Sequence, residues 1–225
     1  MKPWLSEILA CPLDKHYPLN LVIFKIEDLD GFLKKAGNME EMQKDLTFFF
    51  KNAGEERDTG TDLRVINFDD ASGQLLLFDT LVRKPSPSAV YLERIVSSID
   101  ELQPIRDISH ESVKSTITKL LAFKGTVIKA LDAVKKAGTD AEAQKKLIKE
   151  IEPTLVSLNW FKQAVEIEAG VMTCDKCNRW YPIRESIPQM LPDELRREKY
   201  DKEFLVAWKE KLDQAIVTQG IPYHL

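Results

Sequence analysis

Glycine is scarce in this chain of 225 residues, which contains nine of them. No two glycines are separated by a single residue, so the sequence has no GxGxxG turn of the kind that holds a dinucleotide. It also has no GxxxxGKS/T loop for phosphates. Chemistry on nucleotides or on a methyl donor would therefore need a cofactor that is held by another chain.

Cysteine and histidine are also rare, with three of each. An odd number of cysteines excludes a closed set of intramolecular disulfides, and reduced thiols are the expected state in a cytoplasmic protein. The histidines are scattered and no nucleophile motif accompanies them. The sequence therefore gives no indication of an independent enzyme.

The chain lacks an excess of positive charge and lacks long apolar runs. Its 32 Lys and Arg against 36 Asp and Glu give a net charge of −4, a poor basis for binding nucleic acid through phosphates alone. No apolar stretch approaches the ~20 residues that cross a bilayer, and the N-terminus does not resemble a signal peptide. We expect a cytoplasmic protein with no membrane span.

The pattern of apolar residues predicts an α+β fold, with strands near both ends of the chain and helices between them. Two apolar runs separated by DDASG also predict a β-hairpin at 63–82. The expected strands are 19–26, 164–173 and 180–183, and the expected helices are 2–10, 28–36, 39–52, most of 89–162 with breaks near Pro104, Gly138 and Pro153, and 193–217.

Cys174 and Cys177 form a C-x-x-C motif between two strand-like segments, a context that favours a zinc knuckle over a redox pair or two small buried residues. A structural zinc ion needs four ligands, and Cys11 is the one further cysteine. The fourth ligand would be Asp14, which completes a C-x-x-D turn, or His16, which completes C-x-x-x-x-H. A degenerate site without metal is the third alternative.

A dense apolar segment follows the C-x-x-C motif and is interrupted by prolines. Because proline cannot donate a ladder hydrogen bond, this segment is expected at a sheet edge, where it could bind another protein. The alternative is that Phe204 and Trp208 of the final helix cover it. The candidate partner-binding residues are Trp180, Ile183, Ile187, Pro188, Met190 and Leu191.

Both ends of the chain resemble the multifunctional methyltransferase subunit family, the small activators of tRNA, ribosomal RNA and release-factor methyltransferases. The N-terminal segment MKPWLSEILACPLDKHYPL contains the LxxILxCP helix and turn. The later segment IEAGVMTCDKCNRWYPIRESIPQMLP contains an E-x-G-x-x-x-C-x-x-C strand and turn and a YPI-x-x-x-IP-x-ML tail. The order of these features around a long insertion makes the resemblance specific.

The resemblance implies a small zinc-ribbon-like antiparallel β domain built from residues 1–27 and 164–192. Residues 28–163 would form a mainly helical insertion domain that contains the hairpin, and residues 193–225 a C-terminal helix. The resemblance says nothing specific about the length of the insertion or about this last helix.

The resemblance also implies a non-catalytic subunit that forms a heterodimer with an S-adenosylmethionine-dependent methyltransferase through an edge strand. RNA would be reached only through that partner. By position, Cys11, Cys174 and Cys177 match zinc ligands. The residues that match the tail near the partner surface are Ile187, Pro188, Met190 and Leu191.

Two other functions compete with this hypothesis. A zinc ribbon could bind RNA directly, for which Arg179, Trp180 and Arg184 are the local candidates. A thiol redox protein could instead use Cys174 and Cys177 as a reversible disulfide pair.

Overall fold

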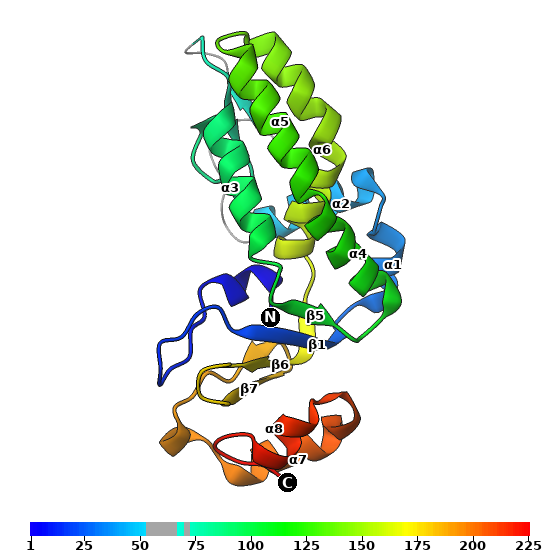
Figure 1. The fold of residues 1–225 in the computed structure, drawn as a ribbon. Coiled ribbons are helices and arrows are strands. Elements are labelled where there is room, and N and C mark those ends of the chain that lie inside the picture. The colour runs from blue at the N-terminus through cyan, green and yellow to red at the C-terminus, as the bar shows by residue number, and fades with distance from the viewer. Residues whose placement is uncertain (53–66, 70–72) are drawn as a thin grey trace. The chain divides into compact units, whose positions relative to one another are not determined.

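The computed structural model describes residues 1–52, 67–69 and 73–225 of the chain, and it has the α+β fold that the sequence predicts (Figure 1). The chain divides into two compact units. Unit 1 contains residues 1–29, 104–115 and 165–225, and unit 2 contains residues 30–103 and 116–164. No described helix has the length and the apolar character that a membrane span requires.

Unit 1 is built on a five-stranded sheet with the strand order β5-β1-β6-β7-β8. The central pairs β1–β6 and β6–β7 are antiparallel, as the family resemblance implies. β5 instead runs parallel to β1, with Leu21 opposite Ile105. The strands are β1 (Asn20–Ile26), β5 (Ile105–Asp107), β6 (Ile167–Thr173), β7 (Trp180–Arg184) and β8 (Ile187–Pro188).

The second strand of the sheet in chain order, β5, lies within the range 28–163 that was expected to form the insertion. The pairing of β5 with β1 begins at Pro104, whose carbonyl accepts a hydrogen bond from the backbone N–H of Leu21 at 2.9 Å. A three-residue strand has too few residues for an alternating pattern to be visible, so this pairing could not be predicted from the pattern of apolar residues.

Gly170 of β6 lies where two strands approach closely. A Cβ atom at this position would lie 2.6 Å from the carbonyl oxygen of Val22 on β1, closer than a real side chain allows. The glycine of the E-x-G-x-x-x-C-x-x-C motif is therefore required by the packing of the sheet.

The segment after the sheet differs from the single final helix expected over residues 193–225. It contains η2 (Asp193–Leu195), α7 (Glu198–Trp208), η3 (Lys209–Lys211) and α8 (Gln214–Gln219). The break falls at Leu212, whose backbone is extended (φ −87°, ψ 145°) and whose side chain is buried. Turning at this residue lets both helices pack on the same sheet.

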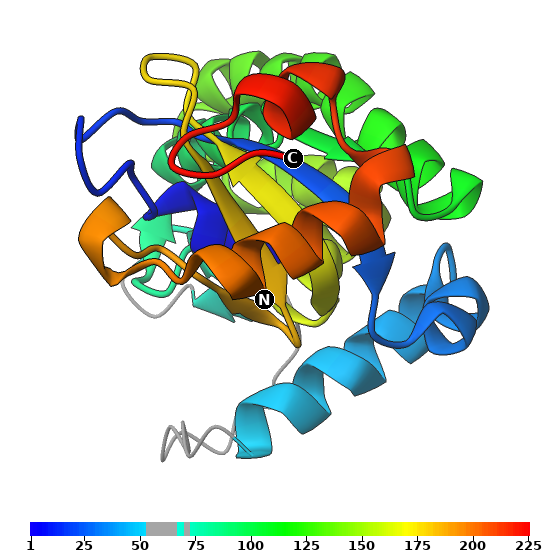
Figure 2. The same cartoon turned by 90° about the horizontal axis from the view of Figure 1, so that it is seen from below.

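One face of the sheet is covered by α7 and α8, which cross the strands in Figure 2. The ring of Trp180 stacks on Phe204 of α7 with 5.9 Å between centroids, and Phe24 of β1 lies 5.3 Å from Trp208. At the other end of the chain, the expected helix over 2–10 is the short 3-10 helix η1 (Pro3–Glu7).

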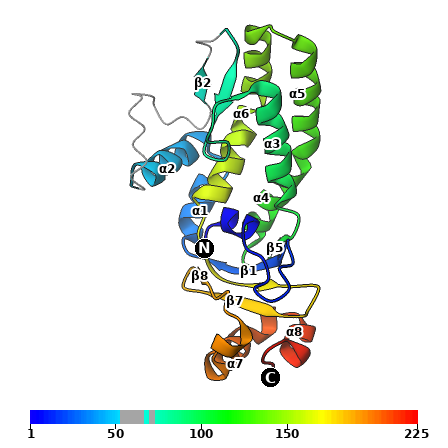
Figure 3. The same ribbon diagram turned by 90° about the vertical axis from the view of Figure 1, so that its left-hand side faces the viewer.

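Unit 2 is mainly helical, and α3, α5 and α6 lie side by side in it (Figures 1 and 3). α6 continues through Pro153, where a break was expected, and Pro153 is exposed at the helix surface. The helices are α1 (Leu29–Lys35), α2 (Met39–Asn52), α3 (Ser88–Asp100), α4 (Glu111–Ala122, which begins in unit 1), α5 (Lys124–Ala137) and α6 (Ala141–Gln163).

A three-stranded sheet completes unit 2. β2 (Asn67–Asp69) and β3 (Leu76–Phe78) pair antiparallel within the range where a hairpin was expected. Residues 63–66 and 70–72 of that range lie outside the described residues. β4 (Ser86–Pro87) pairs with the other edge of β3.

Candidate metal centre

Two turns with the same backbone hydrogen bonds carry the three cysteines. In residues 11–16 the N–H of Cys11 donates to the carbonyl of His16 (3.0 Å), and the N–H of Lys15 donates to the carbonyl of Cys11 (2.9 Å). Residues 174–179 repeat both bonds, from Cys174 to Arg179 (2.9 Å) and from Asn178 to Cys174 (3.0 Å).

The fifth residue of each turn has a left-handed backbone, with φ 55° at Lys15 and φ 56° at Asn178. Aligned in this way, Cys11 corresponds to Cys174, and Asp14 occupies the place that Cys177 has in the second turn. The first turn is therefore a knuckle in which a carboxylate stands where the second turn has a thiol.

The two turns bring four metal-binding side chains together. One ligand atom from each of Cys11, Asp14, Cys174 and Cys177 lies within 4.8 Å of all the others, and the Sγ atoms of Cys11 and Cys177 are 3.8 Å apart. His16, the alternative fourth ligand, does not belong to this group. It corresponds to Arg179 in the second turn, where it contributes its carbonyl oxygen to the turn rather than its ring.

The chemistry of the four groups fits a metal ion. Asp14 Oδ2 is buried and has no hydrogen-bond partner among the described residues, a costly state for a carboxylate oxygen unless a cation satisfies it. Thiolates together with a carboxylate are ligands that zinc accepts. The four residues are therefore close enough, and of the right chemical types, to bind a metal ion.

The thiols of Cys177 and Cys11 are perturbed in opposite directions. Burial and the neighbouring Asp14 carboxyl raise the pKa of the Cys177 thiol to about 12. Burial opposes ionisation of Cys11 as well, but hydrogen bonds from Tyr181 and from the backbone of Asp14 and Leu13 outweigh it and lower the pKa of Cys11. The hydrogen-bonding environment of the cluster thus favours a thiolate at Cys11.

Two further side chains, Arg179 and Tyr181, border the cluster and were not predicted as part of the metal site. The hydroxyl of Tyr181 lies 3.1 Å from Cys11 Sγ, and the guanidinium of Arg179 is held by Asp193 with an Nη2–Oδ2 distance of 2.8 Å. Burial, followed by the hydrogen bond to Cys11, raises the pKa of Tyr181 well above its usual range, so the hydroxyl stays protonated. The sequence signal that could have identified them is their spacing, since Arg179 and Tyr181 are two residues apart just after the C-x-x-C motif.

The candidate partner-binding residues fall into two groups. Trp180 and Ile183 are fully buried, so neither side chain is exposed for docking: Phe204 of α7 stacks on Trp180, and Ile183 pairs with Gly170 of β6 and Pro188 of β8. Ile187 is 60% exposed at β8, the edge strand of the sheet, and Leu191 is 37% exposed beyond it. Pro188 and Met190 are half-buried between them.

Direct binding of RNA would need Arg179, Trp180 and Arg184 on a free surface, but each of them is buried or paired within unit 1. Trp180 is buried, and Arg179 forms its bidentate pair with Asp193. Arg184 donates to the carbonyl of Tyr200 and lies 3.6 Å from Asp201. These three side chains therefore do not form a free basic and aromatic face.

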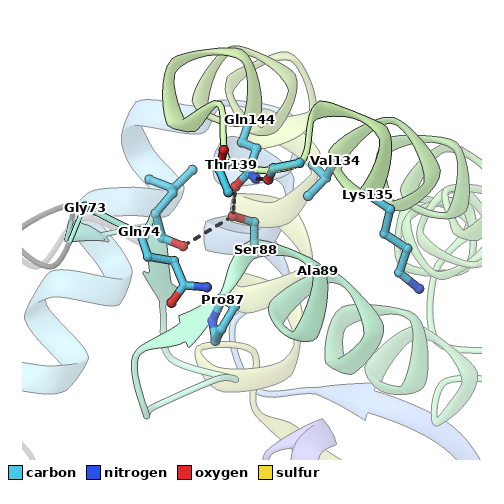
Figure 4. Close-up of a pocket in the computed structure, with 11 residues that line it drawn as sticks. Gly73, Gln74, Pro87, Ser88, Ala89, Val134, Lys135, Thr139 and Gln144 are labelled. Carbon is cyan, nitrogen blue, oxygen red and sulfur yellow. Dashed lines mark hydrogen bonds between the residues drawn. The ribbon is translucent and has the colours of Figure 1, made fainter.

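A pocket of about 270 Å³ lies in unit 2, and its lining residues, between Gly73 and Gln144, include none of the cysteines (Figure 4). Ser88 at the start of α3 occupies its centre, with its hydroxyl 2.6 Å from Gln144 Oε1. Lys135 at the rim is paired with Glu93 at 2.9 Å. Because Glu93 neutralises Lys135, the remaining polar groups of the lining are uncharged, and they indicate no particular class of ligand.

Comparison with protein families matches residues 2–186 to the family described as Trm112p-like protein. The matched range contains Cys11, Cys174 and Cys177 and ends one residue before β8. No curated protein and no solved structure matches the chain.

Proposed function

The chain belongs to the Trm112p-like family, and on this premise we propose that it is a non-catalytic subunit that activates and stabilises S-adenosylmethionine-dependent methyltransferases. Their substrates would be tRNA, ribosomal RNA or release factors, and the chain would reach RNA only through its partner. We place this heterodimer in the cytoplasm, where the three cysteines would remain reduced unless they bind metal.

The family match over residues 2–186 carries this proposal, because it includes both cysteine turns and four of the five strands of the unit 1 sheet. The absence of a GxGxxG turn supports the same division of labour. The methyl donor would bind to the partner, and this chain would contribute surface and stability.

We further propose that Cys11, Asp14, Cys174 and Cys177 hold a structural zinc ion, with Asp14 in preference to His16. The equivalence of the two turns and the buried, unpaired Asp14 Oδ2 support this ligand set. A bound zinc ion would cross-link two turns that are more than 160 residues apart in the sequence.

The proposed partner surface consists of Ile187, Pro188, Met190 and Leu191. β8 is an edge strand, and an exposed edge can extend its sheet with a strand of another protein. Pro188 cannot donate a ladder hydrogen bond, so on this short edge the affinity would come mainly from the apolar side chains.

The test is co-purification with the full-length tagged chain, followed by mass spectrometry and an assay of methyl transfer from labelled S-adenosylmethionine. We expect a methyltransferase to be recovered and its activity to rise when purified chain is added. Ile187→Asp and Met190→Asp should reduce recovery at least about tenfold, because each places a charge in an apolar contact.

Val206→Asp is the matched control, since Val206 is 64% exposed on α7 and is not one of the four residues of the proposed surface. Its recovery of the methyltransferase should equal that of the wild type. Recovery of no methyltransferase would contradict the proposed function. Equal recovery by Ile187→Asp and the wild type would contradict the proposed surface. Salt-sensitive RNA binding by the isolated chain would favour the competing hypothesis of direct RNA binding.

A further inference from the structure

The Tyr181 hydroxyl is a buried polar group whose position is fixed by the sheet. Tyr181 is fully buried in β7, where it lies opposite Met172 of β6. Its hydroxyl lies 3.1 Å from Cys11 Sγ, across 170 positions of sequence. A buried tyrosine needs a partner for its hydroxyl, and here that partner is a proposed metal ligand.

We propose that Tyr181 is a positioning residue for the metal centre, whose hydroxyl donates a hydrogen bond to the Cys11 thiolate when a divalent metal is bound. This inference rests on the zinc site proposed above. A metal-bound thiolate has no proton, so in this pair the tyrosine must be the donor and the sulfur the acceptor.

This hydrogen bond would have two roles: it would offset excess negative charge on the ligands, and it would orient the Cys11 side chain. Three thiolates and one carboxylate bring more negative charge than a divalent ion neutralises, and Cys11 and Cys174 are buried. Hydrogen bonds to the sulfur atoms offset part of that excess. The backbone N–H of Asp14 also donates to Cys11 Sγ, at 3.5 Å, so the Tyr181 hydroxyl lies closer to this sulfur than the Asp14 N–H does.

The second role is to orient the Cys11 side chain. Cys11 belongs to an irregular turn, whereas Tyr181 belongs to a strand that pairs with neighbours on both sides. A hydrogen bond from the strand fixes the direction of the Cys11 side chain before the metal arrives. Such partners of metal ligands hold the ligand in its binding rotamer, and their loss typically weakens metal binding about 10–100-fold.

The experiment compares wild type with Tyr181→Phe in the full-length chain, using Co²⁺ as the probe metal. Affinity is measured by competition with a chromogenic chelator, and the thiolate-to-cobalt charge-transfer band is recorded for each protein. We expect Tyr181→Phe to bind Co²⁺ about 10–100-fold more weakly and to shift the band to lower energy. A thiolate that loses a hydrogen bond is easier to oxidise, which explains the direction of the shift.

Tyr91→Phe is the matched control. Tyr91 is also fully buried, and its hydroxyl donates to Asp79 Oδ2 at 2.7 Å in unit 2. It should lose stability but keep the wild-type Co²⁺ affinity and spectrum. As a second variant with an unchanged ring shape, 3-fluorotyrosine at position 181 has a more acidic hydroxyl and should shift the band to higher energy.

The outcomes separate the two proposals. If the wild type binds Co²⁺ and Tyr181→Phe shows the same affinity and band, the role of Tyr181 is overturned and the zinc site stands. If Tyr91→Phe loses as much affinity as Tyr181→Phe and neither position-181 variant shifts the band, the role is likewise overturned. If the wild type binds no Co²⁺, the proposed zinc site falls, and this inference falls with it.

Discussion

Asp14 is the proposed fourth metal ligand, and the backbone of a six-residue turn is the reason for that choice. Within residues 11–16 the Asp14 carboxyl and the His16 ring are both within sequence reach of Cys11, so spacing leaves both open. The backbone of the turn decides, because it repeats the turn at 174–179 and gives Asp14 the place of Cys177. The candidate ligand is thus chosen by its position in the turn and not by how commonly its residue type binds zinc.

Replacing Asp14 tests this assignment. We expect Asp14→Ala to weaken zinc binding about 100-fold or more, because it removes a ligand, and Asp14→Cys to retain binding, because it completes a second C-x-x-C knuckle. Zinc content by mass spectrometry and affinity by chelator competition measure both variants. His16→Ala is the control and should change affinity by less than about twofold. A larger loss in His16→Ala than in Asp14→Ala would reverse the assignment.

Asp79 in unit 2 is the second residue with an unusual environment. It is buried and accepts hydrogen bonds from the backbone of Leu81 and Val82, from the Tyr91 hydroxyl and from Asn159. Burial raises the pKa of its carboxyl, although these hydrogen bonds oppose the shift. The folded state therefore binds this proton more tightly than the unfolded state does.

The sign of the resulting pH dependence follows directly. The contribution of Asp79 to the free energy of unfolding is greatest below the unfolded pKa of about 4, and it is lost as pH rises through the folded pKa. The difference in unfolding free energy between the wild type and Asp79→Asn, followed by urea unfolding, should decrease from pH 4 to pH 7. A difference that is constant or that rises with pH would show that the hydrogen bonds outweigh burial.

At the scale of elements, α7 has one buried face and one exposed face. Phe204 and Leu205 are buried against the sheet, whereas Val206 is 64% exposed. Phe204 contacts both Phe24 of β1 and Trp180 of β7, with ring centroids 6.2 and 5.9 Å apart. The helix therefore joins two strands through one aromatic side chain.

Phe204→Ala should lower the free energy of unfolding of unit 1 by about 3 kcal/mol or more, because it removes a buried ring and leaves a cavity. Val206→Ala on the same helix should change it by less than about 0.5 kcal/mol. Denaturant unfolding followed by tryptophan fluorescence measures both, since Trp180 and Trp208 belong to the apolar core between α7 and the sheet. Similar values for the two variants would mean that α7 is not packed on the sheet in solution.

The whole molecule places its four candidate metal ligands in one of its two units. Residues 11, 14, 174 and 177 all belong to unit 1, which both ends of the chain build together. A metal ion bound there would stabilise unit 1, because the unfolded chain does not hold the four ligands together. At a free zinc concentration 1,000 times Kd, this linkage amounts to about 4 kcal/mol.

Removal of the metal should therefore act on one unit. We expect a chelator to raise the amide hydrogen exchange of peptides from β1, β6 and β7, measured by mass spectrometry. Peptides from α3, α5 and α6 in unit 2 serve as the internal control and should be unchanged. An increase of equal size in both units, or in neither, would contradict a metal ion that stabilises unit 1 alone.

The sequence by itself determined the features that depend on residue type and on short spacings. It predicted the α+β class, the strands near both ends, the family, and three residues, Cys11, Cys174 and Cys177, that the structure brings together in the candidate metal site. These features are local, since a C-x-x-C motif or an alternating strand is visible within fewer than ten residues. The number of C-terminal helices was missed, because only packing on the sheet shows why the chain turns at Leu212.

The tertiary structure alone decided the features that join distant parts of the chain. Asp14 rather than His16 joins the cluster because two turns more than 160 residues apart meet in space. Trp180 is buried because α7 covers it, β5 joins the sheet from within the expected insertion, and Tyr181 reaches Cys11 across the domain. Each of these features depends on which distant segments contact one another, and neither the composition of the chain nor the spacing of its residues predicts such contacts.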